Sequence, residues 1–341
     1  MTKGANAEEV LRRYFLSLGY FVVRGITFKY RGFEVTDVDL WLYQRSSLIT
    51  RDRTNVDVKN KKTPQAIERI FWTRGLQQVL GLERAVVATT DRRRETKSFG
   101  LQHGVQVIGG EFLSGLMPVF SDAPDRLTED DLRRLLDTRS IVKPELLYRK
   151  LYTEHQQLLL SSLDFNGCNA LLSAVKVMLE DYAAANKVNE AALRLLYIFI
   201  SYFLVALDHA TYHLANEEPP VRHEVLLEGF LYGAAGKERA NEIVNMALGL
   251  VASKRDDGLP SNESAALAQE IAEQLNRYPV ATLANYFAGK EVSRNLFALA
   301  KRFENYGYAT ALPALEKLEP EAKAVIGVLL DFFAFDRKQV L

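Results

Sequence analysis

The chain reads EVTDVDLWLY over residues 34–43 and NVDVK over residues 55–59, and these two stretches decide its fold. Both are rich in β-branched and aromatic residues and alternate apolar with charged positions, which predicts two strands. Side chains alternate between the faces of a strand, so Asp57 and Lys59 share one face. Val56 and Val58 then point to the opposite face, into a core.

The same alternation places Asp37 and Asp39 on one face of the first strand. If the two strands are neighbours, several carboxylates and one amine gather in one place, which is unfavourable unless a cation joins them. Mg²⁺ prefers oxygen ligands and is commonly bound by one or two carboxylates together with water and phosphate oxygens. The sequence therefore predicts a Mg²⁺ site at Asp39 and Asp57, in which Mn²⁺ can substitute, with the Lys59 amine beside it.

The elements around these strands predict an α/β domain over residues 1–120. Strands separated by helices indicate a mixed sheet with helices on its faces. Gly25 and the turn at residues 30–32 indicate a separate short strand between them, and the polar stretch 44–54 predicts a loop. The other expected elements are a helix over residues 6–18, a strand over 20–23, a helix over 63–81, a strand over 85–90, a helix over 94–103 and a strand over 105–108.

Residues 121–341 predict an all-helical domain without a sheet, joined through a linker at residues 122–125. The most apolar stretch, residues 195–207, contains no charge. It is shorter than the roughly 20 residues that a bilayer requires, so we expect a fully buried core helix and no membrane span. The expected helices cover residues 129–137, 145–163, 168–185, 190–215, 222–234, 237–253, 263–277, 292–306 and 321–333.

The net charge of zero over 341 residues hides an asymmetry between the two halves. Residues 1–120 carry 19 Lys and Arg against 12 Asp and Glu, and the rest of the chain carries the opposite excess. A basic first domain suits a polyanionic substrate. The single cysteine, Cys168, excludes an intramolecular disulfide and a cysteine-based zinc cluster. With no signal peptide evident, we expect a cytoplasmic protein.

In this order of elements and acidic motifs, the chain resembles the PD-(D/E)XK nuclease superfamily. It is most similar to Mrr-type restriction enzymes and archaeal Holliday junction resolvases. Members open with a helix that bears a glutamate, followed by a strand with an acid-hydrophobic-aspartate pattern and a strand with an acid-X-Lys pattern. The matching residues here are Glu9, then Asp37-Val38-Asp39, then Asp57-Val58-Lys59-Asn60. The resemblance covers about residues 5–115.

One departure from the family pattern leaves a choice between two aspartates. The family's proline-aspartate pair is absent, since Val38 precedes Asp39. Asp39 is favoured as the metal ligand because it directly precedes the apolar run at residues 40–42, which leaves Asp37 as a neighbouring or strand-edge residue. The resemblance further implies a restriction-endonuclease-like fold, a third metal-binding carboxylate at Glu9 and a catalytic contribution from Gln78 on the following helix.

Several basic residues near these motifs are candidates for phosphate contacts, which dominate the affinity of proteins for nucleic acids. For each of them, an ordinary solvated charge is the alternative interpretation. The candidates are Lys61 and Lys62 after the second motif, Arg74 on the following helix, and Arg92, Arg93 and Arg94 after the next strand.

These expectations combine into a Mg²⁺-dependent endonuclease that hydrolyses phosphodiester bonds, with double-stranded DNA as the expected substrate and defence against foreign DNA as the expected role. RNA cleavage is an alternative that the same site would support. A catalytically silent nucleic-acid-binding or protein-interaction module on the same fold is the main rival interpretation. Cutting both strands of a duplex generally needs two sites, so we expect a homodimer. The helical domain would serve self-association, target recognition, regulation or contacts with other proteins.

Overall fold

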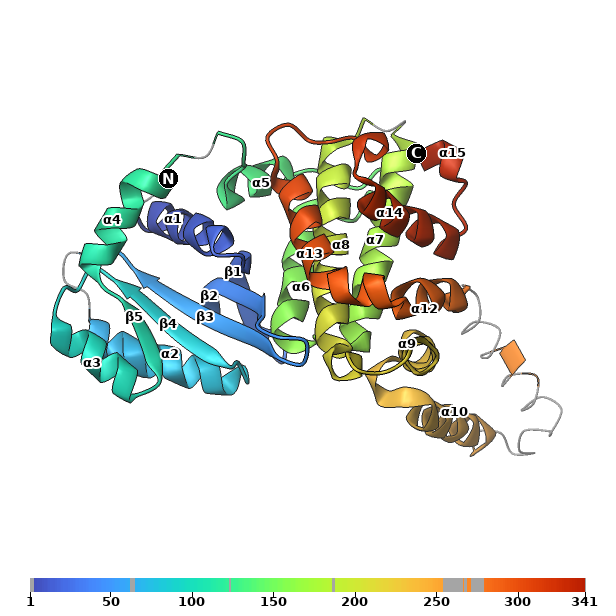
Figure 1. Cartoon of the computed structure of the whole chain (residues 1–341). Helices are drawn as coiled ribbons and strands as arrows, with labels where there is room; N and C mark the ends of the chain where they lie inside the picture. Colours follow the sequence, from blue (N-terminus) through green and yellow to red (C-terminus); the bar gives the residue numbers. More distant parts are fainter. Residues whose placement is uncertain are drawn as a thin grey trace.

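The computed structural model describes residues 3–61, 65–122, 124–185, 188–253 and 279–340, together with residues 266 and 269–270. Its N-terminal part contains one five-stranded mixed sheet in the order β1-β2-β3-β4-β5 (Figure 1). The first three strands are antiparallel neighbours, and β3, β4 and β5 run parallel. The strands are β1 (Phe21–Tyr30), β2 (Phe33–Arg45), β3 (Arg51–Lys59), β4 (Arg84–Thr89) and β5 (Val105–Ile108).

Four helices cover the two faces of this sheet. In Figure 1, α1 (Lys3–Ser17) and α4 (Gly110–Phe120) lie above it, and α2 (Ala66–Val79) and α3 (Arg94–Gln102) lie below it. The upper layer buries apolar residues of α1 and α4 against the even-numbered residues of β2 and β3. The lower layer buries Ile70 of α2 against Val87 and Val105. The expected mixed sheet with helices on its faces is therefore present.

Three details of this region differ from the expectation. Gly25 lies inside the continuous strand β1 with a φ of +66°, so no separate short strand follows it. β3 begins at Arg51, so the β2–β3 connection is shorter than residues 44–54. The structure also contains the helix α4, which the sequence does not predict because two glycines and Pro118 lower its helix propensity. Gly110 is required there, since a Cβ would clash with the Thr90 carbonyl oxygen.

Beyond residue 124 the described part of the chain is helical, with two isolated bridges and no strand. Two short helices, α12 and α15, were not expected, and the helix expected at residues 263–277 lies almost entirely outside the described residues. The α-helices are α5 (Glu129–Leu135), α6 (Tyr148–Ser161), α7 (Phe165–Ala184), α8 (Glu190–Ala210), α9 (Pro219–Tyr232), α10 (Gly236–Ser253), α12 (Val280–Ala288), α13 (Lys290–Tyr308), α14 (Pro320–Phe332) and α15 (Arg337–Val340).

Helix α8 forms the centre of this helical region, which we define as residues 124–340. Residues 195–207 are each at most 1% exposed, which confirms the prediction of complete burial. α8 is long and apolar enough to cross a membrane, but it is enclosed by the other helices, chiefly α7 and α13. The two charged residues that flank this apolar run are also buried and paired: Arg194 donates to the Gly307 and Ala309 carbonyl oxygens, and Asp208 binds Arg51.

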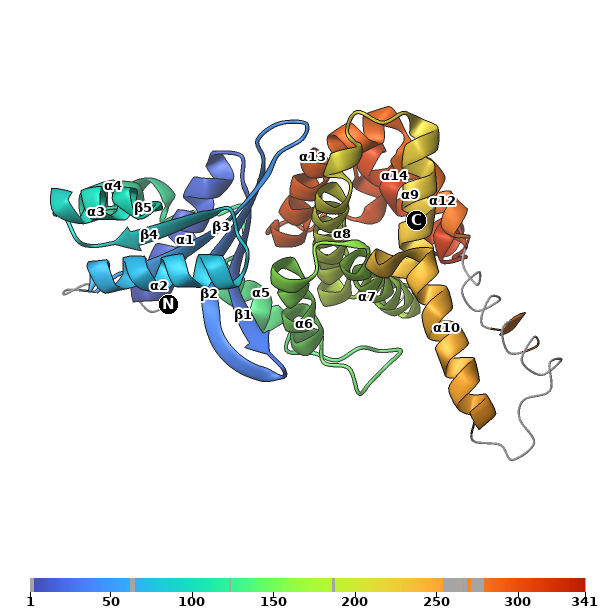
Figure 2. The same ribbon diagram turned by 90° about the horizontal axis from the view of Figure 1, so that it is seen from below.

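The sheet region, residues 3–122, shares its largest hydrophobic core with the helical region. The edge strand β1 lies against α6, as both views of the ribbon show (Figures 1 and 2). Phe21 of β1 contacts Tyr202 of α8 with ring centroids 6.2 Å apart. Tyr43 of β2 donates its hydroxyl hydrogen bond to Asp208 at 2.6 Å. The two regions are therefore continuous in packing although they differ in secondary structure.

Candidate active site

The two motif strands separate at the position of their acidic residues. Pairing of β2 with β3 extends as far as Leu40 and Val56. Beyond this pair, β3 continues beside β4 and β2 continues beside β1, so the strands form a fork. The backbone N–H of Val58 points into the fork and donates to Asp39 Oδ2 at 2.7 Å. The Asp39 carboxylate thus replaces a strand partner at this point.

The fork brings together the three residues at the centre of the sequence prediction. Lys59 Nζ lies 3.8 Å from Asp39 Oδ2 and 3.5 Å from Asp57 Oδ1. The predicted convergence of these two carboxylates and one amine is confirmed. Asp37 is exposed and lies further along β2, opposite Thr27 of β1. The geometry therefore selects Asp39 as the member of the cluster on β2.

Arg69 of α2 also belongs to this site, although it is not among the residues predicted from the sequence. Its guanidinium forms a two-point contact with Asp57, donating from Nε to Oδ2 at 2.9 Å and from Nη2 to Oδ1. Arg69 is half-buried on the first turn of α2. The only sequence signal was a basic residue early in the helix that follows the motif strand, which is too common a pattern to single it out.

Burial raises the pKa of Asp39 to about 6. The Val58 N–H and the Lys59 amine lower this pKa, and the nearby carboxylates of Asp57 and Glu8 raise it further. Lys59, Arg69 and Arg24 each contact a carboxylate of this group, so burial is the main reason that the charged form of Asp39 is costly here. A divalent cation would relieve this cost by favouring the charged form of Asp39.

This raised pKa predicts a pH-dependent difference in stability between the metal-free wild type and Asp39→Asn. Between about pH 4 and pH 6 the folded chain holds a proton at Asp39 that the unfolded chain has lost. The stability contributed by Asp39 should therefore fall as the pH rises through this window. Relative to Asp39→Asn, whose side chain stays neutral, the wild type should lose about 2–3 kcal/mol of its free energy of unfolding between pH 4 and pH 7.

Urea denaturation of both proteins in EDTA, at several pH values, measures this difference. Other titrating groups are common to the two proteins and cancel in the comparison. A difference that stays constant from pH 4 to pH 7 would show that Asp39 titrates normally.

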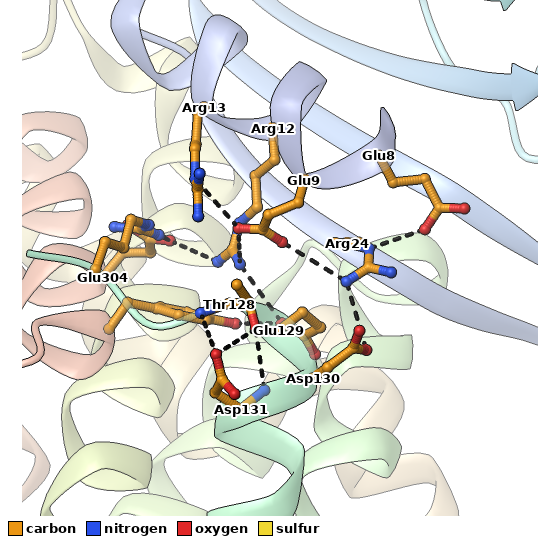
Figure 3. Close-up of polar contacts among 12 residues, drawn as sticks. Glu8, Glu9, Arg12, Arg13, Arg24, Thr128, Glu129, Asp130, Asp131 and Glu304 are labelled. Atoms are coloured by element: carbon orange, nitrogen blue, oxygen red, sulfur yellow. Dashed lines mark hydrogen bonds and ion pairs between the residues drawn. The ribbon is translucent and has the colours of Figure 1, made fainter. Parts of the chain in front are cut away.

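Glu9 lies in a buried network and not beside Asp39 and Asp57. Its carboxylate is 2% exposed and lies 3.7 Å from Arg12, 3.9 Å from Arg13 and 3.6 Å from Arg24 (Figure 3). Arg12 in turn contacts Glu129 and Glu304 of the helical region. The structure thus gives Glu9 a place in the contact between the sheet region and the helical region, where its ion pairs are with three arginines.

The neighbouring Glu8 is the α1 carboxylate that acts on the site. Its negative charge is among those that raise the pKa of Asp39. Glu8 also accepts a hydrogen bond from Arg24 Nε at 2.8 Å, which holds its side chain at the edge of the sheet (Figure 3). Neighbouring helical residues point about 100° apart, so Glu8 and not the expected Glu9 acts on Asp39.

Gln78 and Arg74 lie at the far end of α2. Gln78 is nine positions beyond Arg69, about 13 Å along the helix axis. Both residues line a pocket between α2 and α3, together with Ile70, Phe71 and His103. The Arg74 guanidinium hydrogen-bonds Gln77, whose Nε2 donates to the Leu82 carbonyl oxygen at 3.1 Å. The structure therefore does not bring Gln78 or Arg74 to the carboxylate cluster.

The remaining basic candidates lie near the carboxyl ends of β3 and β4. The Thr90 hydroxyl donates to the Lys61 carbonyl oxygen, so the loops after the two strands adjoin. Lys61, Arg92 and Arg94 are exposed, and we call these three residues the basic rim. The Asp91 carboxylate holds Arg93, whose Nη2 lies 2.6 Å from Asp91 Oδ2. The hydrogen bond from Arg93 lowers the pKa of Asp91 to about 2. Lys62 lies outside the described residues.

The carboxylates of the fork suit Mg²⁺ in number and chemistry, with one condition. Among the described residues, no group of three or more His, Cys, Asp or Glu side chains is arranged as a metal site. Two carboxylates are nevertheless enough for Mg²⁺ when water and phosphate complete the shell. Both oxygens of Asp57 accept hydrogen bonds from Arg69. Each carboxylate oxygen has a second lone pair, so a metal at Asp57 would share these oxygens with Arg69 and compete with its charge.

Comparisons with protein-family models, with curated proteins and with solved structures find no match to this chain. Its function is therefore inferred from the chemistry of the fork and its surroundings.

Proposed function

We propose that the chain is a metal-dependent nuclease with a restriction-endonuclease-like sheet region, and that it hydrolyses phosphodiester bonds in DNA. The observation that carries this proposal is the convergence of Asp39, Asp57 and Lys59 where β2 and β3 separate. The order of the flanking elements supports it, because a helix precedes the fork and a helix, strand, helix and strand follow it. Acidic groups alone would repel a phosphodiester, so a cation is part of the proposal.

Each residue of the fork has a distinct role in this proposal. Asp39 and Asp57 would hold Mg²⁺, which when bound polarises a phosphodiester and lowers the pKa of a coordinated water. Lys59 lies within 4 Å of both carboxylates, where its charge would orient the attacking water and stabilise charge that develops on the phosphate. Val58 fixes the Asp39 carboxylate through its backbone N–H, so this oxygen is already oriented.

The basic rim would hold the sugar-phosphate backbone. Lys61, Arg92 and Arg94 are exposed beside the carboxyl ends of β3 and β4, where Lys59 also lies. Arginine and lysine contacts to phosphates supply most of the sequence-independent affinity for nucleic acids. A homodimer, a cytoplasmic location and a role in defence remain parts of the proposal that rest on the family resemblance and on the chain's composition.

A cleavage assay on plasmid, linear duplex and single-stranded DNA and on RNA, in Mg²⁺ and in EDTA, tests the proposal. We expect cleavage of at least one DNA substrate in Mg²⁺ and none in EDTA. Absence of metal-dependent cleavage on every substrate would reject the nuclease function.

The contact between Arg69 and Asp57 favours the rival function, a catalytically silent module. An arginine that permanently neutralises Asp57 would make a metal unnecessary.

The two functions predict different consequences for Arg69→Gln. In a nuclease, this change removes a competitor of the metal. A charge-assisted contact of this kind is worth about 1.5–3 kcal/mol, so metal affinity should rise about tenfold or more.

Titration of Mn²⁺ into wild type and Arg69→Gln, followed by electron paramagnetic resonance, measures this affinity. Arg31→Gln is the matched control, because it removes the same charge from the exposed turn between β1 and β2. Binding of Mn²⁺ by neither protein would support the silent module.

A further inference from the structure

An exposed aromatic side chain stands next to the fork. The Trp72 side chain of α2 is 45% exposed, and the Arg69 guanidinium lies 5.6 Å from its ring centroid. Arg69 Nε is 2.9 Å from Asp57 Oδ2. One guanidinium therefore contacts both the indole ring and a carboxylate of the fork. A nucleotide whose phosphate lies at Asp57 would have this ring within reach of its own base or of the neighbouring base.

The surroundings of Trp72 favour a nucleic acid as the ligand that contacts this ring. Arg69, Lys59 and the basic rim provide positive charge along the same part of the sheet region. Combining a basic backbone track with exposed aromatic rings is how proteins bind single strands, since every base presents a π-face for stacking. In a duplex the faces of the bases are covered by the neighbouring bases, so the Trp72 ring on the surface of α2 has no base face to contact.

We propose that Trp72 is a stacking platform for an unpaired base, and that the substrate of the fork has unpaired nucleotides next to the scissile phosphate. Single strands and single-stranded flaps both have this property. This inference rests on the proposed function for the position of the phosphate, but the stacking itself does not require cleavage. The expected preference is therefore for unpaired over fully paired DNA.

The neighbouring Phe71 provides a matched control. It is 59% exposed on the same helix, but its ring contacts α3 and not the fork. Its centroid lies 5.5 Å from that of Phe99 and 6.1 Å from that of His103. Phe71→Ala thus removes an exposed aromatic ring of α2 without touching Arg69. Any effect restricted to Trp72 must then come from the ring's position.

The tryptophan content of the chain makes stacking directly visible. The chain has two tryptophans, and the other, Trp41, is completely buried against Tyr43. A base that stacks on Trp72 should quench its fluorescence, while the emission of Trp41 stays unchanged. The chain would be titrated in EDTA and in Ca²⁺, which offsets the charge of the carboxylates, with a short oligothymidylate and in parallel with the same oligothymidylate paired to oligoadenylate.

We expect saturable quenching by the single strand and little quenching by the duplex. Trp72→Ala should weaken single-strand affinity, measured by fluorescence anisotropy of a labelled oligothymidylate, by about tenfold, the loss expected for one stacked base. Trp72→Phe should retain most of the affinity, and Phe71→Ala should retain all of it. Equal quenching by duplex and single strand, or unchanged affinity in Trp72→Ala, would overturn the inference.

The outcome is separable from that of the proposed function. Quenching and the Trp72→Ala defect without cleavage under any condition would leave stacking supported and reject only the nuclease. Metal-dependent cleavage with wild-type single-strand affinity in Trp72→Ala would support the nuclease and reject only the stacking. Thermal unfolding of each variant confirms that a lost affinity does not come from a lost fold.

Discussion

Asp57→Ala is expected to reduce metal-dependent cleavage by more than about 100-fold. Loss of a residue that merely orients a metal ligand typically costs about 10–100-fold, so loss of the ligand itself should cost more. Affinity for DNA should stay similar or rise slightly, because the substitution removes a negative charge and frees Arg69 from its carboxylate. Lys59→Ala should also abolish cleavage, but it should weaken binding, since it removes a cation that faces the phosphates.

The two variants therefore share a catalytic defect and differ in the direction of their binding change. Binding isotherms at several salt concentrations measure this difference, and Lys59→Ala should reduce the magnitude of the salt slope for duplex DNA by about one unit. Asp37→Ala is the matched control, because Asp37 is an exposed aspartate on the same strand as Asp39. If Asp57→Ala cleaves DNA as well as Asp37→Ala does, the fork is not the active site.

Arg12→Met is expected to destabilise the whole chain by about 3 kcal/mol. The Arg12 side chain is 0% exposed and lies 3.7 Å from Glu9, 3.7 Å from Glu129 and 3.1 Å from Glu304 (Figure 3). Its guanidinium also lies 3.9 Å from the ring centroid of Tyr308. Removal of one member of a buried ion-pair network leaves uncompensated charge and typically costs about 3–5 kcal/mol. The lower end applies here, since Arg24, Arg133 and Arg126 still contact the three glutamates.

Urea denaturation, followed by circular dichroism and by the fluorescence of the buried Trp41, measures this loss. Arg134→Met is the matched control, because Arg134 forms an exposed pair with Asp131 on α5 and such pairs contribute about 0–1 kcal/mol. Arg12 joins α1 to α5 and α13, so its loss should weaken the association of the sheet region with the helical region. A variant as stable as Arg134→Met would show that the network contributes nothing to their association.

The strands and the central helix could be predicted from the sequence because their signals are local. A period of two in residues 34–43 and 55–59 determines which side chains share a face, whatever surrounds the strands. That is why Asp57 and Lys59 were expected together and are found together. Residues 195–207 are continuously apolar, so the hydrophobic effect favours their burial in any fold, and they are buried. The short helix α4 was missed for the same local reason, since glycines and a proline obscure its period.

The sequence by itself determined the mixed sheet, the helical C-terminal region and the pairing of Asp57 with Lys59. Only the tertiary structure decided which other residues join Asp57 and Lys59 at the site. The rotation of α1, set by its packing, directs Glu9 into the buried network and leaves Glu8 near Asp39. The placement of α2 across the sheet brings Arg69 to Asp57 and carries Gln78 away. These contacts depend on the orientation of a helix against a sheet, and no local period in the sequence encodes that orientation.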